Sequence, residues 1–571
     1  MNEYTDKYHM DFVPGTVNLT LSQLDTEALN ENPDSTLKTT KDGIILHPQP
    51  TNSPNDPLNW STWTKIAQFS IILFITGFTA ATSNDAGSIQ DSMNEIYDIS
   101  YDSMNTGAGV LFAAIGLSTV LLGPCSSLYG RKITYFICIL LGLCGAAWFG
   151  AAKDTTDTIW SQLFVGASEG CAEAQVQLSL SDMYYSHQLG VVLTGYILAT
   201  SVGTYLGPLI AGFIVEYAGF RWVGWCAVII SGVLLGVLIL FQYETMFDRA
   251  AYFGNISYGK KQKISTIDEK KNDGNGMVDV SSQEELDDDE LDDEHVGGVG
   301  DVGDLGANEP KKSYYENIKM ITLAPSVIGT GFKQYIKILV LQLRVFSFPP
   351  VLLSGLLWGL QDAFLTFYLT TEDDNYYDPP WSYSDTGVAL MNLPCVIGAL
   401  IGCLYAGYFS DRFVIWLSHK NGGIQEAEYR LWFLFPAAII SPVGMLLFGL
   451  GTYNVWSWKV TYTVGLGFIG FGFATSGDIA MGYLMDAYPE MVLEGMIGVA
   501  FINNMIGCIF TFTCSMIIDA LGTKKTYIML AIIDFGTFLF IIPFLLYGKE
   551  MRKWTKSRYI EFVELRDGMK Q

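Results

Sequence analysis

The sequence predicts an all-α membrane protein whose twelve transmembrane helices form two pseudo-symmetric halves of six helices each. Half of the 571 residues are hydrophobic and the mean hydropathy is +0.28, more apolar than a soluble chain of this length. Apolar stretches of about 20 residues, enough to span a bilayer, recur along the chain. They form two groups, and the polar stretch between the groups is far longer than an ordinary connection, which indicates an internal repeat.

The apolar stretches place the helices in chain order. The first half is predicted to contain helices near residues 65–88, 104–127, 132–152, 159–184, 190–215 and 221–243. The second half is predicted to contain helices near residues 345–370, 386–409, 430–452, 458–485, 494–520 and 525–547. The chain is thus divided into a disordered cytoplasmic tail (1–63), an N-terminal half (64–245), an acidic and largely disordered cytoplasmic loop (246–340), a C-terminal half (341–548) and a basic cytoplasmic tail (549–571).

The charge and cysteine content exclude several classes of protein. Much of the acid behind the net charge of −25 lies in the N-terminal tail and in the run Glu284–Glu294. Such acidic blocks are typical of disordered segments and argue against a nucleic-acid partner. The nine cysteines are scattered and form no Cys/His cluster, so no metal site is predicted. No nucleophile–base set or phosphate loop is visible, so we expect neither an enzyme nor a bound cofactor.

Lysine and arginine in the short loops predict the orientation in the membrane, because cytoplasmic loops carry an excess of both. One side has the basic residues Arg131, Lys132, Arg412, Lys420, Lys549, Arg552, Lys553 and Lys556. The opposite side has the acidic residues Asp91, Glu95, Asp98, Asp102 and Glu372. We therefore expect the basic side, with both termini and the long loop, to face the cytoplasm. The basic residues that depart from this pattern are Lys459, Lys524 and Lys525.

The predicted fourth helix carries two carboxylates near the middle of the membrane. Glu169 and Glu173 are spaced i and i+4, so they lie on one face of a helix. A charge at the bilayer centre costs about 3 kcal/mol on insertion scales, and two adjacent carboxylates also repel each other. Glu169 and Glu173 are therefore candidates for both cation binding and proton coupling. The alternative is a structural pair that neighbouring hydroxyls and amides satisfy.

Five further side chains are candidates for substrate binding. Asp362 in the seventh helix lies about 6 Å from mid-span at 1.5 Å per residue, and could instead anchor a helix contact. Asp478 in the tenth helix could be a gate or a ligand, and Asp85 could bind the cation or simply cap the first helix. Trp358 and Tyr368 could offer cation–π faces, although helix packing is the commoner role. Two asparagines are polar enough to line a cavity: Asn392 and Asn503.

Two basic turns and one helix rich in small residues form motifs. The second helix is followed by Gly123-Pro-Cys-Ser-Ser-Leu-Tyr-Gly-Arg-Lys132, and the corresponding turn of the second half reads Gly407-Tyr-Phe-Ser-Asp-Arg412. Small residues in the fifth helix let a neighbouring helix approach closely, and its proline is expected to kink it. The basic turns can bridge helix ends and hold one conformation. The motif residues are Gly123, Gly130, Arg131, Lys132, Gly203, Gly207, Pro208, Gly212, Gly407, Asp411 and Arg412.

These motifs resemble those of the major facilitator superfamily, in its twelve-helix drug:proton antiporter branch. The Pro-rich lead-in to Trp60 and the Glu169/Glu173 helix resemble the fungal Hol-type cation and polyamine transporters. The resemblance covers residues 47–550 apart from the central loop, and it implies the major facilitator fold with alternating access. Ser127 stands where the first basic turn usually has Asp, so we expect the cytoplasmic latch to rest on Asp411 and Arg412. Gln162 replaces an Arg linked to proton coupling, which moves that role to the carboxylates.

The residues and the resemblance together imply a fungal plasma-membrane transporter, multi-pass and monomeric, that couples organic cations to protons. A polyamine such as spermidine, spermine or putrescine has several positive charges separated by methylenes, which suits several carboxylates and an apolar or aromatic wall. We expect uptake. The alternative is a broad drug:proton efflux antiporter, and a third possibility is a non-transporting sensor that signals through the acidic loop.

Overall fold

The computed structural model describes residues 13–18, 46, 48–247, 249, 309–323, 331–377 and 379–568. The acidic run Glu284–Glu294 lies outside the described residues. Within them, ten helices are long and apolar enough to cross a membrane. The predicted fourth helix is not among the ten. It is continuous from Thr155 to Met183 through a π-helical turn, but its two glutamates and three glutamines make it less apolar than the other crossings. The last two predicted helices count as one because they are continuous through a turn at Gly522, so the described chain makes the twelve predicted crossings.

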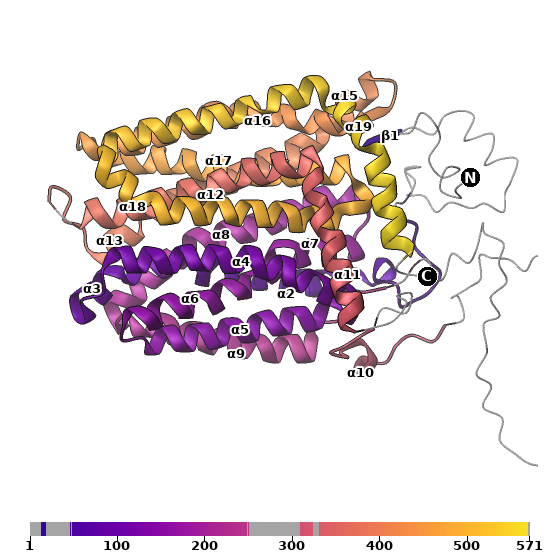
Figure 1. The fold of residues 1–571 in the computed structure, drawn as a ribbon, viewed down its shortest axis with the longest axis horizontal. Helices are drawn as coiled ribbons and strands as arrows, with labels where there is room; N and C mark the ends of the chain where they lie inside the picture. Colours follow the sequence, from indigo (N-terminus) through magenta and orange to yellow (C-terminus); the bar gives the residue numbers. More distant parts are fainter. Residues whose placement is uncertain are drawn as a thin grey trace, which may run out of the picture.

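The N-terminal half occupies one side of the bundle (indigo to magenta in Figure 1). A π-helical turn, η4, joins α6 to α7, so these two pieces form the fourth crossing. The elements of this half are α2 (Thr62–Asn84), α3 (Gln90–Tyr97), α4 (Tyr101–Tyr129), α5 (Arg131–Ala151), α6 (Thr155–Gly170), η4 (Cys171–Gln175), α7 (Val176–Met183), α8 (Ser186–Ala218) and α9 (Arg221–Phe241).

The C-terminal half lies beside it (salmon to yellow in Figure 1). Its eighth and tenth crossings also contain π-helical turns, η8 and η10. The elements are α12 (Pro349–Tyr376), α13 (Asp385–Ala389), α14 (Asn392–Cys403), η8 (Leu404–Phe409), α15 (Ser410–Lys420), α16 (Leu434–Tyr453), η10 (Lys459–Val464), α17 (Gly465–Ala487), α18 (Val492–Leu539) and α19 (Ile541–Gly568).

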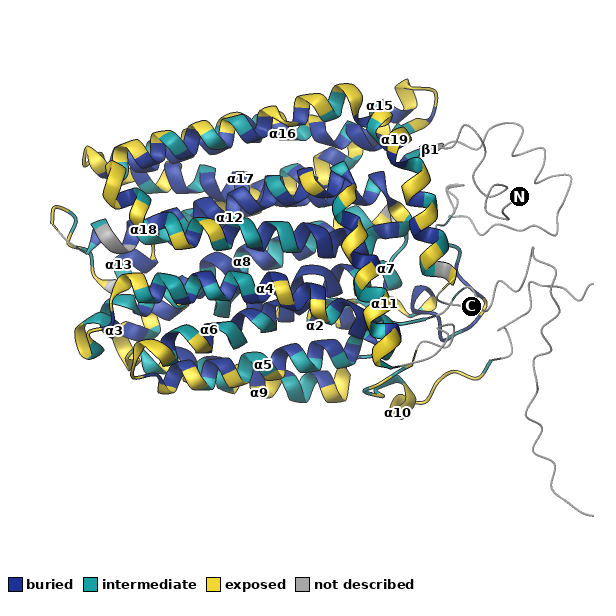
Figure 2. Cartoon of the chain, in the orientation of Figure 1, coloured by how far each residue is buried: buried dark blue, intermediate teal, exposed yellow. Residues whose placement is uncertain are grey.

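The two halves meet through two symmetric helix pairs. Helix α4 packs against α18, and α8 packs against α14 and α17. Figure 2 shows buried residues along these facing helices, whereas exposed residues concentrate on the outward faces of the bundle, as on α16. Apolar side chains on an outward face are expected when lipid surrounds the protein. We call the end of the bundle with Arg131, Lys132 and Arg412 the basic end, and the end with Asp91 and Glu95 the acidic end.

Glycine contacts bring the helices of the N-terminal half close together. A Cβ added to Gly203 would lie 2.1 Å from the Gly77 carbonyl oxygen, and one added to Gly207 would lie 2.5 Å from the Ala81 carbonyl oxygen. The fifth crossing therefore approaches the first closely, as the small residues of its motif predict. On α6, an added Cβ at Gly166 would lie 2.4 Å from the Leu111 carbonyl oxygen. The helix that carries the two glutamates is thereby pressed against α4.

Parts of the N-terminal tail and of the central loop, for which disorder was expected, form regular structure, and so does the basic C-terminal tail. Strand β1 (Thr16–Asn18) pairs antiparallel with β2 (Ile424–Glu426), and α11 (Phe332–Gln342) packs on α4. The residues after Lys549 continue α19 to Gly568. Side chains of the helical bundle contact these segments and stabilise them, and the composition of the segments alone does not reveal such contacts.

One such partner is Arg552, which is fully buried. Its guanidinium donates to Glu428 Oε2 at 2.6 Å and to Glu426 Oε2 at 2.8 Å. The same group also donates to the Pro14 carbonyl oxygen, so it fastens the N-terminal strand to the C-terminal half. The tail is thus held at the basic end by interactions between segments far apart in sequence.

Candidate functional site

Three carboxylates from both halves form the central cluster: the buried Glu169 and Glu173, and Asp362, which is partly exposed. Glu169 and Glu173 are 7% and 6% exposed, on α6 and in η4, and Asp362 lies on α12. Glu173 interacts electrostatically with both other carboxylates. The sequence placed the glutamates on one helical face, and the tertiary structure adds a carboxylate from the opposite half. Each charge in this buried place needs a proton or a cation nearby.

The main chain widens at the glutamates. Residues Cys171–Gln175 form a π-helical turn, so Glu173 lies in a turn with i→i+5 hydrogen bonds rather than on a regular α-helix. Such turns often occur at functional sites because they redirect side chains at the cost of regular backbone bonding. On the preceding turn, an added Cβ at Gly170 would lie 2.1 Å from Ser118 Oγ. The π turn was not predicted, because no residue pattern distinguishes it from an α-helix.

Buried polar atoms without hydrogen-bond partners surround the cluster. In most proteins more than nine-tenths of buried polar groups have partners. Within the described residues, unpartnered atoms include Glu173 Oε2 and the Trp358 indole nitrogen. Asn503 and Ser83 instead interact with Asp362 and Glu169, respectively. Further unpartnered atoms on nearby helices belong to Gln162, Gln175, Gln177, Tyr205, Thr475 and Ser476. This polar lining can exchange hydrogen bonds with a substrate that carries several donors.

Aromatic side chains complete the wall of the cluster. Trp358 is 2% exposed and lies one helical turn before Asp362, with its ring 3.5 Å from the position of a Cβ added at Gly477. Tyr196 and Tyr205 of α8 interact electrostatically with Glu173 and Asp362, respectively. Trp358 was a predicted candidate, whereas the two tyrosines were missed. Their spacing of nine residues on an apolar helix resembles ordinary packing, so the sequence carried no signal for them.

Asp478 lies apart from the central cluster, in a network at the basic end. Its Oδ2 accepts a hydrogen bond from Thr194 Oγ1 at 3.0 Å, which links α17 to α8 across the two halves. Arg430 pairs with Asp411 at 2.8 Å and with Asp486 at 2.9 Å. Asp478 thus connects the two halves, and its role as a gate or as a substrate ligand stays a prediction.

The two charged residues of the second basic turn, Asp411 and Arg412, have different partners. Arg430 is the partner of Asp411, and the Arg412 guanidinium lies over the Tyr408 ring, 4.2 Å from its centroid. Adjacent residues on a helix point in different directions, so a side chain from the next crossing reaches the carboxylate instead. Asp411 itself abuts the other half, because an added Cβ at Gly190 of α8 would lie 2.3 Å from Asp411 Oδ2.

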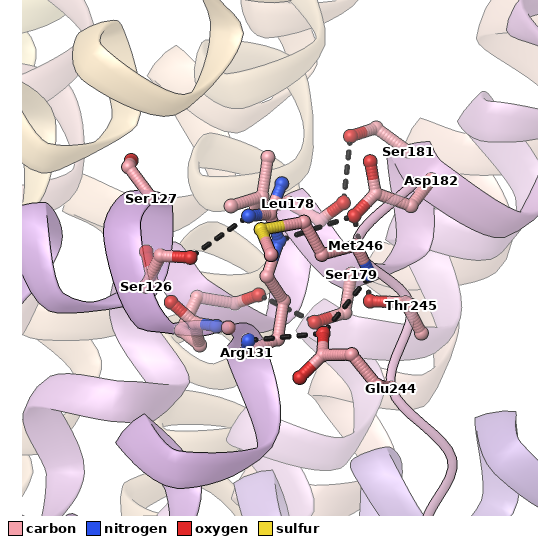
Figure 3. A network of polar contacts seen from close by, with 12 residues as sticks. Ser126, Ser127, Arg131, Leu178, Ser179, Ser181, Asp182, Glu244, Thr245 and Met246 are labelled. Atoms are coloured by element: carbon pink, nitrogen blue, oxygen red, sulfur yellow. Dashed lines mark hydrogen bonds and ion pairs between the residues drawn. The ribbon is translucent and has the colours of Figure 1, made fainter. Parts of the chain in front are cut away.

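The basic turn of the N-terminal half forms a second network, drawn in Figure 3. Arg131 pairs with Asp182 at 3.2 Å and donates to the Ser126 carbonyl oxygen at 2.8 Å. The Glu244 carboxylate accepts hydrogen bonds from the backbone N–H groups of Arg131 and Lys132 at 3.0 and 3.1 Å. Asp182 ends the same crossing that carries the two glutamates, so this network connects the basic turn with that helix.

The glycines and lysine of this turn have specific roles. Gly130 has φ +106°, and a Cβ there would lie 2.5 Å from Glu244 Oε2, so both backbone and space require glycine. Lys132 is fully buried and donates to the carbonyl oxygens of residues 239, 242 and 318 at 3.0, 2.9 and 2.8 Å. A Cβ at Gly123 would lie 2.7 Å from Ile497 Cδ1 of α18. This turn therefore touches the opposite half although Ser127 replaces its Asp.

Two predicted ligands lie at the acidic end, away from the central cluster. Tyr368 donates a hydrogen bond to Asn392 Oδ1 at 3.0 Å and packs edge-on against Phe448. Asp85 follows the last residue of α2 and occupies its C-cap position. No group of three or more His, Cys, Asp or Glu side chains in the described part of the chain is arranged to hold a metal ion.

Comparisons with known proteins agree with this architecture. The Major Facilitator Superfamily model matches residues 69–512. The chain is 54% identical to Protein HOL1 of Saccharomyces cerevisiae over the full length of both. It is 47% identical to an uncharacterized MFS-type transporter, C1271.10c, of Schizosaccharomyces pombe, with 92% of this chain and 91% of that protein covered.

Among solved structures, the human organic anion transporter MFSD10 (TETRAN) is similar in fold, with a TM-score of 0.50 at 14% identity. The similarity covers 87% of this chain and all of that one. The matched family model spans most of the twelve crossings. The chain therefore belongs to the Major Facilitator Superfamily and is a multi-pass membrane transporter of small substrates.

Proposed function

We propose that this transporter carries polyamines or other organic cations and couples their movement to protons. The observation that supports the proposal is the central cluster, where carboxylates of both halves meet among unpartnered polar atoms. An amine with several charges offers one ammonium group to each carboxylate, and its methylenes suit the walls formed by Trp358 and Tyr205. A neutral drug does not require three clustered acids.

Proton coupling follows from the same geometry. Glu169, Glu173 and Asp362 repel one another when ionised, and burial makes each uncompensated charge costly. The cluster is therefore stable with protons or with a bound cation, and a cation displaces protons when it enters. Alternating access then requires the basic-end contacts, such as Thr194–Asp478, to form and break as the halves rock.

The proposal also includes the direction of transport and the membrane in which the protein lies. An excess of Lys and Arg at the basic end favours a cytoplasmic location for that end and for both termini. We propose uptake across the plasma membrane by a monomer, with spermidine, spermine or putrescine as substrates. The alternative is a drug:proton efflux antiporter, to which the resemblance of the Gly203–Gly212 motif points.

Uptake of radiolabelled spermidine by cells with and without the protein tests the proposal. Expression should increase accumulation several-fold, and the increase should collapse when a protonophore removes the proton gradient. An efflux antiporter would instead lower accumulation of spermidine or of a drug. Unchanged spermidine accumulation would contradict polyamine transport. Accumulation that the protonophore does not reduce would contradict proton coupling.

A further inference from the structure

Glu372 is a buried carboxylate that lies outside the central cluster. It lies on α12 ten residues after Asp362, about 15 Å further toward the acidic end at 1.5 Å per residue. Glu372 is 3% exposed, and its Oε1 has no hydrogen-bond partner among the described residues. A buried and unsatisfied carboxylate oxygen is costly unless a ligand or proton compensates it.

Glu372 lines a hollow between the two halves, which we call the outer hollow. The C-terminal half contributes Glu372 and Asn392, and the N-terminal half contributes Ser88, Pro208 and neighbouring residues. The hollow lies at the acidic end, where α12 and α13 meet the loop before α3 and the acidic-end part of α8. The outer hollow therefore lies between the central cluster and the acidic-end surface, away from the contacts that join the halves at the basic end.

The lining of the outer hollow suits one ammonium group with an aliphatic chain. Asn392 Oδ1 accepts from Tyr368 and retains a second lone pair, and Tyr368 also interacts with the Glu372 carboxylate. An ammonium group offers three donors, which match acceptors of this kind. Leu369, Val388 and Ala389 supply apolar wall for methylene groups.

We propose that Glu372 and Asn392 form a second cation site, at which an ammonium group of an aliphatic amine binds on its path between the acidic-end surface and the central cluster. This inference rests on the proposed transport of cations, but the site itself can be tested without transport. The outer hollow also gives Pro208 and Gly212 a second role, because these motif residues line it.

The first test measures electrostatic attraction into the outer hollow. Ser88→Cys places a thiol in its wall, and mass spectrometry of the peptide gives its rate of reaction with an ammonium-bearing thiosulfonate and with a neutral one of similar size. We expect the cationic reagent to be preferred about tenfold, and Glu372→Gln in the same background to reduce the preference to near one. Glu95→Gln, at an exposed acid of the same end, should leave it unchanged. Equal preferences with Glu372 and with Glu372→Gln would overturn the site.

The second test uses spermidine uptake. Glu372→Gln should raise the half-saturating concentration about tenfold and leave the maximum rate within about twofold, since a site on the path affects capture more than turnover. Asn392→Leu, which conserves volume, serves as a second variant and should act in the same direction. An unchanged half-saturating concentration in both variants would contradict the site. If the wild-type chain carries no polyamine, the proposed substrate is wrong, and the labelling preference still decides whether the outer hollow binds cations.

Discussion

Glu173 lies in the π turn, interacts with two other carboxylates and has one oxygen without a hydrogen-bond partner. Glutamine keeps its shape and removes its titratable charge. We expect Glu173→Gln and Glu169→Gln each to reduce concentrative spermidine uptake at least tenfold while the protein still reaches the membrane. At least one of them should also flatten the dependence of uptake on external pH. Near-normal, pH-dependent uptake in both variants would show that the pair is only structural.

Asp362 has a matched control on α18. Asp534 is fully buried, and its Oδ1 accepts a hydrogen bond from Gln361 at 2.8 Å inside the C-terminal half. Asp362→Asn should raise the apparent KM for spermidine more than it lowers the maximum rate, because Asp362 completes the central cluster. Asp534→Asn should alter thermal stability with little effect on KM. Kinetics and melting curves of the two variants check this, and equal KM values would assign Asp362 to packing.

The contact between α8 and α2 depends on glycine at the element scale. A Cβ at Gly203 would lie 2.1 Å from a backbone oxygen of α2, whereas one at Gly232 of α9 meets no atom within 4 Å. Gly203→Ala should destabilise the protein by about 1–3 kcal/mol through overpacking. Gly232→Ala should be neutral or stabilising by up to about 1 kcal/mol. Thermal unfolding of the purified proteins measures the difference, and a Gly203→Ala variant as stable as wild type would refute the close approach.

The strand pair β1–β2 should depend on pH. Burial alone would raise the pKa of Glu426, but hydrogen bonds from Lys549, Thr16 and Arg552 outweigh it and lower that pKa. A lowered pKa means that the stabilisation is present above the ordinary glutamate value of about 4.3 and is lost as pH falls through the folded value.

Glu426→Gln is therefore expected to lower the melting temperature near neutral pH, and the difference from wild type should shrink below about pH 4.3. Melting curves across this range test the prediction. Glu95→Gln on exposed α3 should show no such pH-dependent difference. A constant difference for Glu426→Gln would show that its ionisation does not support the strand pair.

At the scale of the whole molecule, the two halves and their connections are separable. Residues 265–305, which lie outside the described part of the chain, have a composition that cannot bury a core. Deleting them should leave surface expression and spermidine uptake within about twofold of wild type. Fluorescence of a tagged protein at the cell surface and uptake assays check both. Loss of expression would contradict the expected disorder. Normal expression and normal uptake together with loss of a cellular signalling response would favour a signalling role.

The twelve crossings were predictable because each needs about 20 apolar residues, a local property that the chain displays directly. The close contact of the Gly203–Gly212 motif was also predictable, since small residues indicate where a neighbouring helix can approach. Glu169 and Glu173 stood out because a carboxylate inside an apolar helix is conspicuous in one dimension. These features follow from composition and spacing within single segments.

Contacts between distant segments were decided only in three dimensions. Asp362 of the C-terminal half interacts with Glu173 of the N-terminal half, and Arg430, 19 residues further along the chain, pairs with Asp411. Strand β1 and helix α19 are held in place by Arg552. From the sequence alone, this basic residue could equally well lie in a solvated tail. The energy of such an ion pair depends on which charged groups lie next to each other in the folded protein. Hydropathy along the chain does not show which groups these are.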